Sequence, residues 1–91
     1  METQEATIQA LKESILKVWA FEKKLQLTVD ITTKEIEEIA EEMEMMTGEK
    51  LEKYEAMLKA AKESNQKAAR QLENVKARHE SLRSKLHQKL N

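Results

Sequence analysis

The chain has 91 residues with no proline, no cysteine and one glycine, and 36% of its residues are charged while 3% are aromatic. An average globular chain of this length contains about four or five prolines and about six glycines. Sandwiches, barrels and doubly wound α/β folds need many turns marked by these residues, so the composition argues against all three. It predicts an all-α protein whose long helices bury apolar residues along a seam or against partners.

The two halves of the chain carry opposite charge. Residues up to Thr47 include eleven acidic and five basic side chains, a net charge of −6, and residues from Gly48 onward include six acidic and eleven basic side chains, a net charge of +5. Such a division favours pairing of the halves with each other, antiparallel pairing of two copies, or contact of the basic half with an anionic partner. We expect antiparallel pairing to set the acidic half against the basic half.

Residues 6–46 are predicted to form an acidic helix, because apolar residues recur there with the heptad spacing of a coiled coil. The seam positions, with Glu22 and Thr32 as polar interruptions, are Ile8, Leu11, Ile15, Val18, Leu25, Val29, Ile36, Ile39, Met43 and Met46. Residues 25–32 also alternate apolar and polar as a strand does, and Thr32 with Glu35 resembles a capping box. A kink near residues 28–33 or a short strand is therefore an alternative to a continuous helix.

Residues 47–50 separate this seam from a second one that is displaced by one residue, and they contain the only glycine, Gly48. In one architecture they form a turn in which Gly48 is the left-handed cap of the first helix, so that the chain folds into a hairpin. In the other, a single helix runs through Gly48 at a cost of about 1 kcal/mol and pairs in parallel with a second copy.

Residues 51–90 are predicted to form a basic helix with the second seam. Its seam positions are Leu51, Tyr54, Leu58, Ala61, Asn65, Ala68, Leu72, Val75, His79, Leu82 and Leu86. Antiparallel alignment brings the polar Thr32 opposite Asn65, where the two side chains have a hydrogen-bonding partner in each other. It also sets Glu22 opposite Val75 and Val18 opposite His79. We favour the antiparallel coiled coil or hairpin over the parallel dimer, although an antiparallel dimer of straight helices would make the same layers between chains.

A second apolar stripe lies outside the first seam. On a helix, Leu16, Ala20, Leu27 and Ile31 share one face, with Trp19 at its edge and Phe21 beside the seam on the other side. A two-stranded coil leaves such residues exposed. We therefore expect residues 15–31 to be buried on more than one face, and the chain to dock a partner helix or further copies into a larger bundle. The predicted docking residues are Leu16, Trp19, Phe21, Leu27 and Ile31.

Three polar groups have simpler explanations than ligand binding. The acidic residues Glu35, Glu37, Glu38, Glu41, Glu42 and Glu44 are expected to form a solvated face, because cation sites need converging oxygen ligands. The basic residues Lys67, Arg70, Lys76, Arg78, Arg83, Lys85 and Lys89 are expected to complement the acidic half, with a nucleic-acid-binding arm as the alternative. His79 and His87 lack the spacing of a zinc motif. We expect His79, on the seam, to weaken it when protonated below pH about 6.5.

The sequence contains no glycine-rich phosphate loop, no cysteine nucleophile and no catalytic constellation that two helices would bring together. No apolar run approaches the roughly 20 residues of a membrane span. We therefore expect a non-enzymatic coiled-coil scaffold module, with no cofactor, metal or small-molecule substrate, that self-associates or docks a helical partner in a larger complex. An intracellular location, cytoplasmic or nuclear, is expected.

Overall fold

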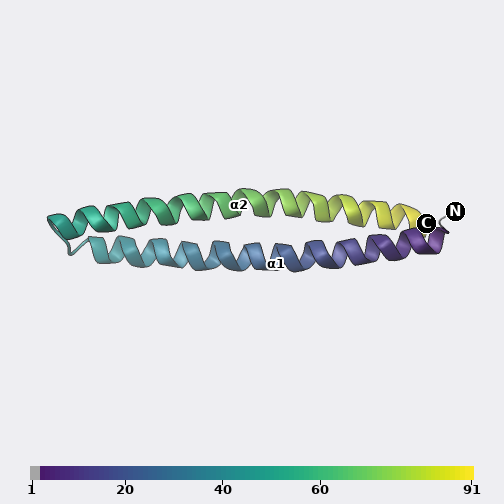
Figure 1. The fold of residues 1–91 in the computed structure, drawn as a ribbon, viewed down its shortest axis with the longest axis horizontal. Helices are drawn as coiled ribbons and strands as arrows, with labels where there is room; N and C mark the ends of the chain where they lie inside the picture. The colour runs from purple at the N-terminus through teal and green to yellow at the C-terminus, as the bar shows by residue number, and fades with distance from the viewer. Residues whose placement is uncertain (1–2) are drawn as a thin grey trace.

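The computed structural model describes residues 3–91, which form two long helices. Helix α1 spans Gln4–Met43 and helix α2 spans Glu49–Leu90. The helices lie side by side and run in opposite directions, so the start of α1 and the end of α2 lie at one end of a molecule that measures 69 × 19 × 14 Å (Figure 1). The predicted all-α class is confirmed, because residues 3–91 contain no strand.

Helix α1 begins at Gln4 because Thr3 caps it. The backbone of Thr3 is extended, and its Oγ1 accepts a hydrogen bond of 3.1 Å from the backbone N–H of Ala6. Glu5 adds negative charge in the first turn, where the free N–H groups of a helix favour it. The helix therefore starts two residues before the predicted boundary at residue 6.

Helix α1 continues without a break through residues 25–32, where the alternating pattern also fitted a strand. The hydroxyls of Thr28, Thr32 and Thr33 donate hydrogen bonds to carbonyls one turn earlier, at 3.1, 2.8 and 2.7 Å. Such bonds satisfy a threonine hydroxyl inside a helix. Since a strand needs a partner and residues 3–91 offer none, the helical alternative prevails here.

Residues 44–48 connect the helices. The backbone N–H groups of Glu44, Met45 and Met46 donate to carbonyls three residues earlier, which tightens the final turn of α1. Gly48 has a φ of 70° and lies directly before α2 as its N-cap. The connection is therefore 44–48 rather than 47–50, and Gly48 caps the start of α2 instead of the end of α1.

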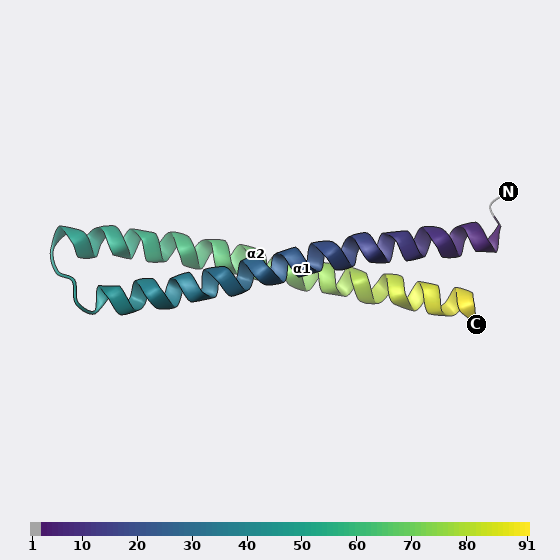
Figure 2. The ribbon, with the colours of Figure 1, turned by 90° about the horizontal axis from the view of Figure 1, so that it is seen from below.

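The core is a narrow seam between the helices and is most closed near the middle of the molecule. Leu25, Thr32, Ala68 and Leu72 are buried, and the other predicted seam residues are half-buried. In the second view α1 crosses α2 near the midpoint, which shows that the helices wind around each other (Figure 2). Two helices alone leave every seam side chain partly open at its flanks, and no large side chain in the described chain falls below 2% exposure.

Candidate interaction surface

A polar pair interrupts the apolar seam at its centre. The amide nitrogen Nδ2 of Asn65 donates to Thr32 Oγ1 at 2.8 Å, and it also lies 3.0 Å from Thr33 Oγ1 and 3.2 Å from the carbonyl oxygen of Val29. Thr32 Oγ1 in turn donates to the carbonyl of Thr28. The expected pairing of Thr32 with Asn65 is present, and it ties the two helices together in one longitudinal alignment.

A second polar pair crosses the seam between Glu22 and His79, with 2.9 Å between Glu22 Oε2 and His79 Nδ1. The alignment had set each of these residues opposite a valine. Glu22 and His79 instead lie one layer apart along the helix axis. One layer of four residues spans about 6 Å, and the two long side chains reach diagonally across this distance. The imidazole of His79 therefore has a polar partner within the apolar seam.

The five predicted docking side chains all remain exposed in the single chain. Leu16 is 65% exposed, Leu27 is 60% exposed, and Trp19, Phe21 and Ile31 are each about half exposed at 48%, 49% and 49%. The second buried face expected for residues 15–31 is therefore absent within one chain. Large apolar side chains without cover mark a surface that can exclude water only against another molecule.

These five residues do not form a single patch. At about 100° per residue, Leu16, Leu27 and Ile31 fall within about 60° of arc on the side of α1 opposite the seam. Trp19 and Phe21 lie about 160° apart, one on each flank. The ammonium of Lys23 lies 5.6 Å from the centroid of the Trp19 ring, so the ring carries a cation over one face. We call Leu16, Ala20, Leu27 and Ile31 the outer stripe.

Charge is separated along the length of the molecule rather than neutralised between the helices. The half nearer the turn, residues 33–64, carries ten acidic and five basic side chains, a net charge of −5. The half nearer the chain ends, residues 3–32 with 65–91, carries six acidic and eleven basic side chains, a net charge of +5. From here on, the acidic half means residues 33–64 and the basic half means residues 3–32 with 65–91, in place of the N-terminal and C-terminal parts of the chain.

Folding back sets the acidic helix α1 as a whole beside the basic helix α2, but the acidic run and the basic run within them do not face each other. The acidic run at residues 35–44 lies beside the first turns of α2, whose charges nearly cancel, and the basic run at residues 67–89 lies beside the first part of α1 (Figure 1). The contact between Glu22 and His79 is the only one between an acidic and a basic side chain across the seam in the part of the chain that the structure describes. The charged side chains remain available to other molecules.

The basic residues of α2 are divided between two faces. At about 100° per residue, Lys67, Arg78 and Lys85 share one face, whereas Lys76 and Arg83 lie roughly 140–180° away on another. Lys76 and Arg83 line a shallow groove between the helices together with Trp19 and His79, and the groove also contains Glu22 and Glu80. This division and these carboxylates make the surface a poor continuous track for a phosphate backbone.

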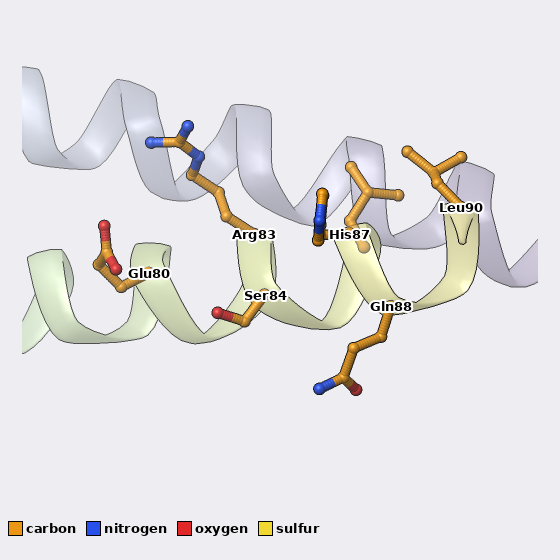
Figure 3. A pocket seen from close by; sticks show the side chains of 7 residues that line it. Glu80, Arg83, Ser84, His87, Gln88 and Leu90 are labelled. Atoms are coloured by element: carbon orange, nitrogen blue, oxygen red, sulfur yellow. The ribbon is translucent and has the colours of Figure 1, made fainter.

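A second shallow depression lies near the open end of α2. Its lining includes Glu80, Arg83, Ser84, His87 and Leu90. In the close view, Arg83, His87 and Leu90 extend toward α1, whereas Ser84 and Gln88 point away from it (Figure 3). His87 has a partner on its own helix, since its Nε2 lies 3.1 Å from Asn91 Nδ2. The side chains diverge rather than converge, so this depression lacks the geometry of a catalytic site.

Near the turn, Tyr54 lies beside the acidic run of α1. The charge of the Glu42 carboxylate raises the pKa of the Tyr54 phenol above its usual value of 10.0, and a hydrogen bond with Glu42 and partial burial act in the same direction. The antiparallel arrangement of the two heptad seams sets Tyr54 opposite Met43, so the heptad spacing alone does not predict its contact with Glu42. The phenol tip reaches past the seam to a flanking carboxylate, which is typical of a half-buried tyrosine.

The other polar groups do not converge on a ligand. Residues 3–91 contain no group of three or more histidine, aspartate or glutamate side chains that could hold a metal ion, and Glu37, Glu41 and Glu44 point to solvent. Neither described helix includes a segment long and apolar enough to cross a membrane. Comparisons with protein-family models, with curated proteins and with solved structures found no match to this chain.

Proposed function

We propose that this protein is a non-enzymatic assembly module, a helical hairpin that scaffolds a larger complex by docking helices against its outer surface. The observation that carries the proposal is the exposure of Leu16, Trp19, Phe21, Leu27 and Ile31 along α1, at 48–65% of each side chain. Aromatic and branched aliphatic side chains of this kind anchor helix-in-groove and helix-on-helix interfaces.

We also propose that the chain folds back on itself in solution rather than pairing as one long helix. The Asn65 and Thr32 hydrogen bond and the positive φ of Gly48 support this arrangement. X-ray scattering tests it, because the longest dimension of the hairpin is 69 Å whereas a continuous helix of this chain would extend about 130 Å. A maximum dimension near 130 Å would contradict the hairpin and favour the parallel dimer or a domain-swapped form.

The assembly function is tested by molar mass in light scattering or sedimentation and by capture of helical partners. We expect the parent chain to exceed the mass of one 10.6 kDa chain at micromolar to millimolar concentration, or to bind a partner helix. The double variant Leu16→Ser, Leu27→Ser should lose this association while keeping its helical signal. Met57→Ser is the matched control, since Met57 is also 50% exposed but lies on α2. Equal association of the parent and the double variant would refute the proposal.

A nucleic-acid-binding arm is the second candidate, favoured by the +5 charge of the basic half. Binding of this kind weakens steeply with salt because it releases counterions. Titration of a generic duplex at two salt concentrations separates the two functions. Salt-sensitive duplex binding that survives Leu16→Ser, Leu27→Ser and disappears in Lys76→Gln, Arg83→Gln would favour the second candidate.

A further inference from the structure

The outer stripe is symmetric along α1. Its members, Leu16, Ala20, Leu27 and Ile31, are separated by four, seven and four residues, so the spacing is the same in both chain directions. The midpoint of the stripe falls between Lys23 and Lys24, which is also the midpoint of α1, the helix from Gln4 to Met43. A helix face with this symmetry can pair with a copy of itself about a two-fold axis.

In such a pair the two α1 helices run antiparallel and overlap along their whole length. Leu16 then lies beside Ile31 of the second copy, and Ala20 lies beside Leu27 of the second copy, so each larger side chain has an apolar neighbour. The outer-stripe residues fall within about 60° of arc on α1. Their spacing of four, seven and four residues lets the side chains of the two copies interdigitate in layers, as in an antiparallel coiled coil. The small side chain of Ala20 near the axis allows the helices to approach closely.

The polar residues that continue the outer stripe obey the same symmetry. Glu13 falls beside Lys34 of the second copy, and Gln9 falls beside Glu38 of the second copy. Each contact occurs twice in a two-fold pair. Lys23, near the axis, extends over its own Trp19 ring, which draws its ammonium toward the flank of α1. The face is therefore complementary to itself in apolar surface and at the two contacts between Glu13 and Lys34, whereas Lys23 falls beside Lys24 of the second copy near the axis.

Charge over the whole hairpin favours the same orientation. Antiparallel pairing sets the acidic half of one copy, at −5, beside the basic half of the other, at +5. A parallel pair would set like charges together over both halves, which costs free energy at low ionic strength. Since few pairs within the chain neutralise these charges, they remain to act between chains.

We propose that the partner of the outer stripe is a second copy of this chain, docked antiparallel through α1 to form a four-helix dimer with the two α1 helices at its centre. The inference rests on the proposed assembly function and adds the identity and orientation of the partner.

Because the protein has no cysteine, single-cysteine variants can report the orientation by fluorescence transfer. Thr47→Cys labels the turn and Gln88→Cys labels the open end, where the Gln88 side chain points away from α1 (Figure 3). Mixing labelled Thr47→Cys with labelled Gln88→Cys should give strong transfer between copies, and mixing two batches of Thr47→Cys should give weak transfer. The reverse pattern in an assembled dimer overturns the orientation while the assembly function stands. A single-chain mass at millimolar concentration overturns the docking of a second copy, and the assembly function is then overturned only if the chain also captures no partner helix.

A charge exchange tests the contact between Glu13 and Lys34. Glu13→Lys places two lysines together twice per dimer and should weaken self-association about tenfold at low salt. The double variant Glu13→Lys, Lys34→Glu restores opposite charges and should return the affinity to within about twofold of the parent. Glu73→Lys, with the same change in net charge but on α2, is the control. Weakening by Glu73→Lys equal to that by Glu13→Lys, or no recovery in the double variant, contradicts this register.

Discussion

The two helices contribute equally to the seam but differ on their outer faces. On α2, the exposed large apolar side chains are Met57 near the turn and Leu90 at the open end, whereas α1 exposes Leu16, Trp19, Phe21, Leu27 and Ile31 within sixteen residues. Pairing with α2 therefore covers one apolar face of α1 and leaves a second one in water. The exposed apolar face of α1 is the surface that the proposed assembly function would bury against another molecule, and α2 offers no comparable face.

The largest expected effect is the difference in unfolding free energy between a substitution in the seam and one on the outer face of α1. Leu72, only 6% exposed, contacts the seam of α1, and Leu72→Ala should lower the free energy of unfolding by about 2–4 kcal/mol, because it removes buried methyl groups and leaves a cavity. Leu27→Ala, at a side chain 60% exposed, should change it by less than about 0.5 kcal/mol in dilute monomer. Urea unfolding monitored by circular dichroism measures both. Similar losses would mean that the outer stripe belongs to the fold of one chain.

The next effect concerns the turn on which the proposed hairpin depends. Gly48 has open space where a Cβ would lie, but its φ of 70° disfavours any L side chain. Gly48→Ala should cost about 1–3 kcal/mol of hairpin stability and shift the chain toward longer, paired helices. Scattering dimensions and mass report the shift. Thr47→Ala, at an exposed neighbour with negative φ, is the control, and unchanged stability in Gly48→Ala would argue against a strained turn.

A smaller effect is expected at the polar layer of the seam. Asn65→Ala removes a donor that reaches Thr32, and the free energy of unfolding should fall by about 0.5–1.5 kcal/mol. Thr33→Ala removes only the longer of the two hydroxyl contacts, at an exposed position, and should cost less. Chemical unfolding of the two variants and of the double variant measures the coupling. Additive losses in the double variant would show that these side chains act independently.

The smallest effect is a titration near the turn. The Glu42 carboxylate raises the pKa of Tyr54 from 10.0, so Glu42→Gln should bring the phenol pKa back toward that value, as measured by ultraviolet absorbance. Because the folded chain holds the phenol proton more tightly than the unfolded chain, this stabilisation is complete below pH 10 and is lost as the pH rises through the folded pKa. Glu41→Gln removes the same charge from the neighbouring position and should shift the pKa less.

Several features of the fold could be predicted from the residues alone. Scarcity of glycine and proline indicated long helices, and heptad spacing identified seam residues, all of which are buried or half-buried. The same spacing left residues 16–31 with apolar side chains outside the seam, and these are exposed. Such features follow from local propensity and from the 3.6-residue period, which a single helix already determines.

Other features depended on how the two helices meet. The bond between Glu22 and His79 arises because long side chains reach diagonally across one layer, whereas heptad spacing pairs only the residues that lie directly opposite each other. The end of α1 at Met43 reflects the backbone geometry needed to reach α2, which tightens the last turn and leaves Gly48 to begin the next helix. Separation of charge into two halves became visible only when residues far apart in the chain were placed side by side. The sequence by itself determined which side chains each helix presents, and the tertiary structure decided which of them meet, because contact between helices depends on their relative position and reach.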